Sequence, residues 1–581
     1  MKRTHHCAQL RAPDIGKEAV LAGWVNKRRD LGGLIFVDLR DREGMTQLVF
    51  NPEHNKKLYE LAATLKREDV ISVKGKVKRR IEGQTNAEMP TGEVEVFADE
   101  LEIVGRAESL PLDNDIPSSD DTRLKWRYID LRKPSMARNL RFRHQVAMAA
   151  REYFNSQGFL EVETPMLVRS TPEGARDYVV PSRVHPGKFY ALPQSPQLYK
   201  QLLMIAGVDK YFQFARCLRD EDLRTDRQPE HTQMDLEMSF VEQEDVMAFV
   251  EGLYKHIFKK SLGIALEKFP ALSYKECMDK YGIDKPDIRF GLLLSDVTDI
   301  AGKSELNIFK DCVANTGIVK CICPERDFTR KEIDDLTAFV KEHGAKGLAY
   351  AKVTEKGFDG GAAKFFSKEL TIELLARTGA KPGSTLFLIA DTPKICNEAL
   401  ARLRLKLGTL LGLIDKKQFK FLWVIDFPLF EWDDEAKRWA PAHHMFSMPK
   451  KECLPYLESD PGRVIAALYD VVLNGTELGS GSIRIHDPEI QKRVMKVIGM
   501  SEEEAIRKFG FLIEAYKYGA PTHGGMGLGF DRLVALMLGL EDIREVIAFP
   551  KNKQAQSLMD GCPDRIDESQ MKELNIKVNR K

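Results

Sequence analysis

A run of alternating residues near the middle of the chain constrains its fold most. In residues 233–240, two sets of side chains alternate: Met234, Leu236, Met238 and Phe240, and Gln233, Asp235, Glu237 and Ser239. Successive side chains of a β-strand point to opposite faces, so the run predicts a strand with one apolar and one polar face. Antiparallel sheets commonly have such a polar face, whereas parallel sheets are covered on both sides. We therefore expect an antiparallel sheet here.

The chain around this strand is too long for one hydrophobic core. Its 581 residues predict two to four domains. Lys plus Arg (88) nearly balance Asp plus Glu (87), which gives a formal charge of +1. A surface that binds nucleic acid must therefore be local, because the chain as a whole is not basic.

The sequence contains no apolar stretch long enough to span a membrane. We therefore expect a cytoplasmic protein that does not insert into a membrane. The nine cysteines are scattered, and only Cys321 and Cys323 lie close together, without a nearby set of histidine ligands. This spacing favours reduced structural thiols over a zinc site.

Residues 1–105 contain five short runs rich in Val, Ile and Phe, at 20–25, 34–39, 45–50, 70–77 and 94–104. Between the third and fourth runs, Leu58, Leu61, Ala62 and Leu65 recur at the spacing of one buried helix face. Five strands with a helix after the third are typical of an OB-fold barrel, a common binder of single-stranded nucleic acid.

A basic stripe agrees with that use of the barrel. In residues 73–80, apolar residues alternate with Lys74, Lys76, Lys78 and Arg80, and residues 27–29 add a second basic cluster. Such a stripe can bind phosphate, but it can equally be a solvated face. Phe36 and Gln47 are candidates for stacking on bases and reading them, or else ordinary barrel residues.

The rest of the chain divides by its pattern. We expect a linker at 106–134, an inserted α/β domain at 289–411, a polar tail at 561–581, and between them a domain in two parts, 135–288 and 412–560, that carries the chemistry. The insertion is predicted from strands at 317–323, 347–353 and 384–390 and from a helix with a capping box of Thr329 and Glu332. The whole is expected to be a multidomain α+β protein.

Three separated stretches hold residues suited to chemistry. In residues 158–165, a helix end runs into a strand that stops at proline. Arg219 then stands among acids at the end of a second strand, and a charged loop leads into the alternating strand. This hairpin could clamp a triphosphate, because Arg pairs bidentately with phosphate and acids can hold Mg²⁺; a surface ion-pair cluster is the alternative.

In the third stretch, residues 525–533, glycines alternate with larger residues before Arg532 opens a helix. Glycine permits the close approach of a planar or phosphate ligand. The run lacks the βαβ context of a dinucleotide fold, and the chain has no GxxxxGK phosphate loop.

In this order, the three stretches resemble the signature motifs of class II aminoacyl-tRNA synthetases. Residues 171–177, 194–200, 219–222, 227–230, 443–444, 479–486 and 529–532 resemble the bacterial-type aspartyl members of that class. The resemblance implies an OB-fold domain that binds the anticodon and a class II antiparallel-sheet catalytic domain. It also implies ATP with Mg²⁺, L-aspartate and tRNA-Asp as ligands, and a homodimer.

The resemblance further implies roles for individual residues. The aspartate pocket would contain Glu173, Ser195, Gln197, Lys200, Arg219, Asp235, His443 and Arg484. ATP would be bound by Arg219, Asp220, Glu221, Gln228, Glu477, Gly529, Phe530, Asp531 and Arg532, of which Arg219 and Arg532 would be catalytic. Mg²⁺ would be held by Asp470 and Glu477, and the anticodon by Arg29, Phe36, Gln47 and Glu93.

These residue types suit the reaction on physical grounds. An acidic amino acid has two carboxylates and one ammonium, so its site needs at least two cations and one carboxylate. The chain supplies Lys200, Arg219, Arg484 and Glu173. Adenylate formation needs no protein nucleophile, because the substrate carboxylate attacks the α-phosphorus directly and pyrophosphate leaves.

Several alternatives remain open. The adjacent His443 and His444 suggest a metal site, but on a strand they would point to opposite faces. A lysine-specific enzyme would need acids in place of Lys200 and Arg484, whereas an asparagine-specific enzyme, an aspartate-amidating paralogue and an RNA-binding protein with a decayed core are further rivals. Whether tRNA-Asn is also charged is a further open point. By resemblance to the family, Leu31 favours an enzyme strict for tRNA-Asp, whereas Gly83 favours one that also charges tRNA-Asn, and we favour tRNA-Asp alone.

Overall fold

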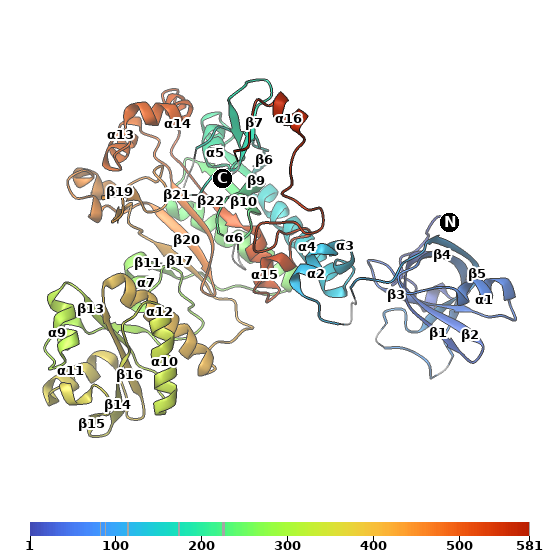
Figure 1. Cartoon of the computed structure of the whole chain (residues 1–581), viewed down its shortest axis with the longest axis horizontal. Coiled ribbons are helices and arrows are strands. Elements are labelled where there is room, and N and C mark those ends of the chain that lie inside the picture. The colour runs from blue at the N-terminus through green and yellow to red at the C-terminus, as the bar shows by residue number, and fades with distance from the viewer. Residues whose placement is uncertain (82, 88, 113–115, 172–174, 223–226, 580–581) are drawn as a thin grey trace. The chain divides into compact units, whose positions relative to one another are not determined.

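The structure, a computed structural model, describes residues 1–81, 83–87, 89–112, 116–171, 175–222 and 227–579 (Figure 1). Its contacts divide the chain into two compact units, Met1–Ala137 and Arg138–Lys581. Within the described residues, no helix is both long and apolar enough to cross a membrane.

The first unit contains a closed five-stranded barrel, which confirms the predicted OB-fold. Its strands β1 (Glu18–Leu31), β2 (Leu34–Arg40), β3 (Met45–Phe50), β5 (Val94–Gly105) and β4 (Val70–Arg79) follow one another in that spatial order. Helix α1 (Lys56–Ala63) lies between β3 and β4 in the chain, and the Asn55 side chain caps it. Leu58, Ala62 and Leu65 join the barrel core, as their spacing predicts, whereas Leu61, expected on the same buried face, is 37% exposed. The short elements η1 (Ala12–Asp14), α2 (Asp120–Lys125) and α3 (Arg127–Asp130) flank the barrel in sequence.

The second unit is built on an eight-stranded sheet, and the predicted antiparallel pattern is confirmed in its centre. The spatial order is β11 (Ala271–Ser273), β17 (Phe421–Ile425), β20 (Leu468–Leu473), β21 (Thr476–Ile483), β22 (His523–Gly529), β10 (Glu230–Ser239), β9 (Lys210–Leu218) and β6 (Leu160–Glu161). The pairs at the two edges, β6 with β9 and β11 with β17, are parallel, and the others are antiparallel.

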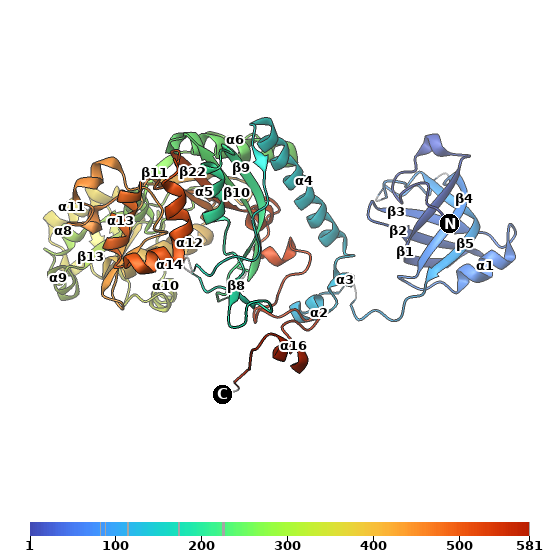
Figure 2. The same ribbon diagram turned by 90° about the horizontal axis from the view of Figure 1, so that it is seen from above.

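Helices cover the apolar face of this sheet. The principal core joins α4 (Pro134–Ser156), α6 (Gln243–Leu262) and α15 (Phe530–Met537) to Met234, Leu236 and Met238 of β10. Figure 2 shows α4 and α6 beside β9 and β10. A smaller core contains residues of α5 (Gln197–Ile205), α13 (Pro488–Val497) and α14 (Glu502–Tyr516). The unit also contains the hairpins β7 (Val179–Pro181) with β8 (Phe189–Ala191) and β18 (Phe430–Asp433) with β19 (Arg438–Pro441), and the short helices η3 (Lys451–Tyr456), η4 (Pro461–Arg463), η5 (Ile543–Glu545) and α16 (Glu568–Glu573).

The predicted alternation is correct through Ser239 and wrong at Phe240. Strand β10 ends at Ser239, and Phe240 adopts a left-handed conformation with φ of 56°. Its backbone N–H donates to the carbonyl of Thr522, and its side chain is 78% exposed. The two-residue period therefore stops one residue before the sequence pattern does.

A second sheet follows β11 and α7 (Tyr274–Tyr281) in the chain. Strands β12 (Leu294–Asp296), β13 (Ile318–Ile322), β16 (Thr385–Asp391), β14 (Ala349–Thr354) and β15 (Gly357–Asp359) pair antiparallel in that spatial order. One core contains residues of α10 (Arg330–Glu342) and α12 (Pro393–Leu410), and another contains residues of α8 (Thr298–Ala301), α9 (Asn307–Ala314) and α11 (Lys368–Thr378), with η2 (Ala363–Phe365) nearby in sequence. The predicted capping box of Thr329 and Glu332 is present. The exact domain limits given above stay predictions.

Candidate active site

A cavity of about 540 Å³ is lined by polar residues of β10 and by glycines of β21 and β22. The register places Asp235 opposite Gly527 and Glu237 opposite Gly525. A Cβ atom at Gly525 would lie 2.1 Å from a carboxylate oxygen of Glu237, and one at Gly479 would lie 2.5 Å from the carbonyl of Gly527. Glycine is therefore required at both positions, because any side chain would collide with its neighbour.

Two cations and two carboxylates form a buried cluster at one end of the cavity. Arg484 donates through Nε and Nη2 to the two oxygens of Glu237, at 2.9 and 3.2 Å. Lys200 Nζ donates to Asp235 at 2.8 Å and lies 3.3 Å from Glu237. The formal charges of this quartet cancel, and Arg484 and Lys200 are each 1% exposed.

The surroundings shift the pKa values of both carboxylates of this cluster and of the neighbouring His444. Burial opposes ionisation of Glu237, but Arg484 and Lys200 outweigh it and hold the pKa of Glu237 below its usual value. Burial raises the pKa of Asp235 in spite of Lys200. Burial and the charge of Arg484 lower the pKa of His444 well below its usual value. Since Arg has no acceptor, the neutral His444 must accept the 2.9 Å hydrogen bond from Arg484 at Nε2.

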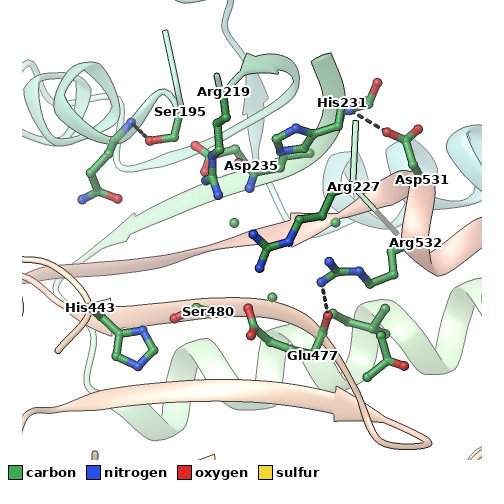
Figure 3. A pocket seen from close by; sticks show the side chains of 18 of the residues that line it. Ser195, Arg219, Arg227, His231, Asp235, His443, Glu477, Ser480, Asp531 and Arg532 are labelled. Atoms are coloured by element: carbon green, nitrogen blue, oxygen red, sulfur yellow. Dashed lines mark hydrogen bonds between the residues drawn. The ribbon is translucent and has the colours of Figure 1, made fainter. Parts of the chain in front are cut away.

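Three arginines lie along the other part of the cavity wall. Arg219 directly follows β9, and its buried Nε has no hydrogen-bond partner among the described residues. Arg532, near the start of α15, donates to the backbone carbonyl of Glu477 at 2.6 Å. In Figure 3, Arg227 lies between His231 and Glu477. This concentration of guanidinium groups suits a polyanionic ligand.

The polar groups around these arginines hold the wall together. Asp531 accepts from the backbone N–H of Thr232 at 2.8 Å and forms an ion pair with Arg143. The amide of Gln228 exchanges two hydrogen bonds with the backbone of Lys551, at 2.8 and 3.2 Å. Burial, together with Arg219 and Arg532, lowers the pKa of His231 to about 3. His231 therefore presents a neutral aromatic ring to the cavity.

A pair of carboxylates lies next to this wall. Glu477 of β21 lines the cavity, whereas Asp470 of β20 is 3% exposed and lies opposite Ser480. Burial and the neighbouring Glu477 raise the pKa of Asp470 well above its usual value. Its Oδ1 is buried without a hydrogen-bond partner among the described residues.

The structure brings most of the predicted site residues together. Those that line the cavity are Ser195, Gln197, Lys200, Arg219, Glu221, Gln228, Asp235, His443, Glu477, Arg484, Gly529, Asp531 and Arg532. Three others do not line it: Asp470 is buried beside it, Asp220 lies 3.5 Å from Arg176, and Phe530 packs edge-on against Phe214. Glu173 lies outside the described residues.

The strand geometry assumed for the two adjacent histidines is wrong. His443 and His444 follow β19 outside any strand, and both line the cavity. Sequence analysis also missed Arg227, His231, Glu237, His444 and Lys285 as cavity or cluster residues. Glu237 lies on the predicted polar face of the alternating run, so the pattern itself contained the signal for it.

The barrel carries a separate candidate surface. Arg29 lies opposite Phe36 on the paired strands, and it donates to Asp38 at 2.7 Å and to Gln47 at 3.2 Å. Phe36 is half-buried, and Glu93 is exposed. Three of the four predicted anticodon residues are therefore neighbours on β1, β2 and β3.

The predicted basic stripe is shorter than its sequence pattern. Strand β4 ends at Arg79, so Arg80 falls outside the alternation, and its buried side chain donates to the carbonyl of Val94 at 3.3 Å. Lys78 lies over the ring of Phe97, with 3.8 Å from Nζ to the centroid. Lys74 lies 3.2 Å from Glu18. The exposed positive charge of this face is therefore smaller than predicted.

Comparisons with known families agree with this architecture. Residues 119–553 match the family of class II tRNA synthetases (D, K and N), and residues 19–104 match the OB-fold nucleic acid binding domain. The "Aspartate--tRNA(Asp/Asn) ligase" of Caldanaerobacter subterraneus subsp. tengcongensis is 50% identical, over 100% of this chain and 99% of its own length. The "Aspartate--tRNA ligase" of Macrococcus caseolyticus is 52% identical, over 99% of this chain and 98% of its own length.

Solved structures show the same fold. Asparaginyl-tRNA synthetase from Pyrococcus horikoshii, complexed with asparaginyl-adenylate, superposes with a TM-score of 0.60 at 20% identity, covering 95% of this chain and 98% of its own. A putative aspartyl-tRNA synthetase from Leishmania major superposes with a TM-score of 0.59 at 18% identity, covering 95% of this chain and 94% of its own. From the family match and the full-length relatives, the chain belongs to the class II tRNA synthetases and, within them, to the aspartate–tRNA ligase family.

Proposed function

We propose that this chain activates L-aspartate with ATP and transfers the aspartyl group to the 3′ end of tRNA-Asp. The proposal depends on one observation: the buried cluster that contains Lys200 and Arg484 lines one part of the cavity, and three other arginines line another part. The first part suits an amino acid with an anionic side chain, and the second suits a triphosphate.

For aspartate, we propose that Lys200 and Arg484 bind the side-chain carboxylate. Ser195 and Gln197, together with Glu173, bind the ammonium, and Asp235 and His443 line the same pocket. Asp235 and Glu237 already hold the two cations in the ligand-free chain. Because these contacts fix both cations before substrate arrives, little side-chain entropy remains to be lost on binding.

For ATP, we propose that Arg219 bridges the aspartate carboxylate and the α-phosphate, and that Arg532 neutralises charge on the phosphates. Glu221, Gln228 and Gly529 form the rest of the nucleotide wall. Asp531 acts by holding the hairpin through Thr232. Asp220 and Phe530 lie outside the wall, so their contributions are made through the hairpin and through α15.

Asp470 and Glu477 have the chemistry of a magnesium site. Mg²⁺ prefers carboxylate oxygens, and the unpartnered, buried Oδ1 of Asp470 is a group that such an ion would satisfy. When bound with ATP, Mg²⁺ supplies further neutralisation of phosphate charge. Glu477 and Asp470 would hold it.

The reaction needs positioning and charge neutralisation, and no covalent intermediate with the protein. The aspartate α-carboxylate attacks the α-phosphorus, and pyrophosphate leaves. Arg219 and Arg532 stabilise the charge that develops on the phosphate oxygens. The tRNA ribose hydroxyl then attacks the adenylate, and AMP leaves.

For tRNA, we propose that Arg29, Phe36, Gln47 and Glu93 of the barrel bind the anticodon, with Phe36 stacking on a base. The names of the relatives divide between ligases for tRNA(Asp/Asn) and a ligase without that extension. Leu31 is 60% exposed in the β1–β2 hairpin, where a tRNA base could contact it. Our inclination towards tRNA-Asp alone, like the cytoplasmic location, stays a prediction.

We also propose a homodimer. The edge strand β6 and the segment after it expose Leu160 (55%), Met166 (42%) and Leu167 (52%), and α4 exposes Met148 (51%). An uncovered edge strand with apolar neighbours is a surface that a second copy would protect from other pairing.

Charging assays with purified tRNA-Asp and tRNA-Asn test the proposal. We expect [¹⁴C]aspartate to become acid-precipitable with tRNA-Asp in the presence of ATP, and Arg219→Ala to abolish this. Failure of the parent protein to esterify either tRNA would contradict the proposed function. Equal charging of both tRNAs would overturn only the inclination towards tRNA-Asp.

A further inference from the structure

A short segment before the inserted sheet reaches the cavity. Residues 282–292 lie between α7 and β12 in the chain, and Lys285 within them lines the cavity together with Gly475 and Glu477. Asp287 in the same segment touches the β20–β21 turn, since a Cβ atom at Gly475 would lie 3.2 Å from that of Asp287. We call residues 282–292 the strap.

The position of the strap is fixed from the inserted sheet's side. Arg404 of α12 is 2% exposed and donates to four strap carbonyls, those of Asp287 (3.0 Å), Phe290 (2.8 Å), Gly291 (2.7 Å) and Leu292 (2.9 Å). Its guanidinium also lies 3.9 Å from the ring centroid of Phe290. Four carbonyl acceptors on one guanidinium leave the strap little freedom to shift.

A second interaction stiffens the strap near the cavity. Arg289 binds both carboxylate oxygens of Asp287, at 2.6 to 3.2 Å. Asp287 is thereby held against the turn that leads into Glu477. Arg404, Asp287 and the turn form a continuous path of contacts from α12 to the cavity wall.

Lys285 has uncommitted hydrogen-bonding capacity. Its Nζ lies 3.9 Å from both Asp284 and Glu477, beyond hydrogen-bonding distance, and among the described residues it donates no hydrogen bond. Its side chain is 42% exposed. Lys285 could instead serve only to balance the charges of the two nearby carboxylates. That role would not require the strap to be anchored at four carbonyls.

We infer that Lys285 contacts the β- and γ-phosphates of ATP and that Arg404 of the inserted domain holds the strap in the position this contact requires. The inference rests on the proposed function, because it takes ATP as the ligand of this cavity. A lysine ammonium is a compact charge on a flexible stem, which suits phosphate oxygens. Lys285 lies 3.9 Å from the carboxylate of Glu477, and the backbone carbonyl of the same residue accepts from Arg532, so Lys285 and this arginine share a neighbour in the cavity wall. The inserted domain thus contributes to nucleotide binding.

Calorimetric titration with ATP and with AMP tests the contact with Lys285. The Lys285→Met variant should bind ATP about tenfold more weakly than the parent, because it lacks one charged hydrogen bond. Its affinity for AMP, which lacks the β- and γ-phosphates, should stay within about twofold of the parent's. The matched control is Lys280→Met, because Lys280 of α7 pairs with Glu276 and does not line the cavity. Unchanged ATP affinity, or equal losses for ATP and AMP, would overturn the inference.

A second pair of variants tests the anchor. Lysine at position 404 keeps the charge but cannot match four carbonyls, so Arg404→Lys should weaken ATP about threefold without affecting AMP. Arg402→Lys, at an exposed position on the same helix, is the control. If a folded Arg404→Lys variant binds ATP with the parent's affinity, Arg404 does not position the strap for ATP binding. Aspartate-dependent pyrophosphate exchange by the parent distinguishes a failure of the proposed function from a failure of this inference. Absence of exchange contradicts the proposed function. Exchange by the parent, combined with an unchanged ATP affinity of Lys285→Met, contradicts the inference alone.

Discussion

Replacement of Arg484 with leucine tests which residue selects the side chain of the substrate. Arg484 makes five polar contacts: Glu237 Oε1 and Oε2, Ser482 Oγ, His444 Nε2 and the carbonyl of Gly525. The side chain is 1% exposed. Its loss would leave Lys200 as the one cation facing both Asp235 and Glu237 in the cluster, and a buried carboxylate left uncompensated in this way costs about 3 to 5 kcal/mol. The free energy of unfolding should fall by about that amount.

Aspartate activation should fall for a different reason. If Arg484 forms a desolvated pair with the substrate carboxylate, Arg484→Leu should lower kcat/KM for aspartate by roughly two to four orders of magnitude. The affinity for ATP should barely change, because the guanidinium lies in the cluster with Glu237 and Lys200. Pyrophosphate exchange at varied aspartate and ATP concentrations measures both quantities.

A double variant separates folding from recognition. Arg484→Leu with Glu237→Gln removes the stranded charge, so it should regain part of the lost stability in urea unfolding. It should not regain aspartate activation, because the cation is still missing. If the folded double variant activates aspartate within about threefold of the parent, Arg484 has no part in selecting the substrate. Glu237→Gln alone is the matched control for the loss of the carboxylate.

Three further predictions concern the barrel, the assembly and the effect of pH. Phe36→Ala should weaken tRNA binding by roughly 1 to 3 kcal/mol through lost stacking and leave tRNA-free exchange intact; equal loss of both would refute an anticodon role. Light scattering should show a dimer, and an active monomer of 66.0 kDa would refute the proposed interface. Since the pKa of His231 falls from 6.5 to about 3 on folding, unfolded chains take up a proton between these values, and stability should decline as pH falls through that range. His231→Phe should flatten this decline in urea unfolding at about pH 7 and pH 5, whereas the exposed control His185→Phe should not; equal slopes would contradict the assignment.

The local periods of the sequence predicted the elements on which the site is built. The five apolar runs and the spacing of Leu58, Ala62 and Leu65 predicted the barrel, because both depend on neighbours within a few residues. The alternating run predicted a strand with a polar face for the same reason. Local patterns fail at element ends, as at Phe240, and outside regular elements, as at His443 and His444.

Partners that are distant in the sequence could not be predicted from it. Glu237 and Arg484 are 247 positions apart, and their pairing arises from the positions of β10 and the segment after β21 in one sheet. The four carbonyls bound by Arg404 lie more than 100 positions away. Resemblance supplied the residues of the pocket, but only the folded chain shows that its cations are already held by carboxylates.

Pyrophosphate exchange with single amino acids tests whether the cavity selects aspartate. The purified parent chain is incubated with ATP, Mg²⁺ and labelled pyrophosphate, and with aspartate, asparagine or lysine in separate reactions. We expect label in ATP with aspartate alone, because Lys200 and Arg484 line the cavity and are the residues proposed to bind a side-chain carboxylate. Exchange with asparagine or lysine at the rate seen with aspartate, or no exchange with any of the three, would contradict it.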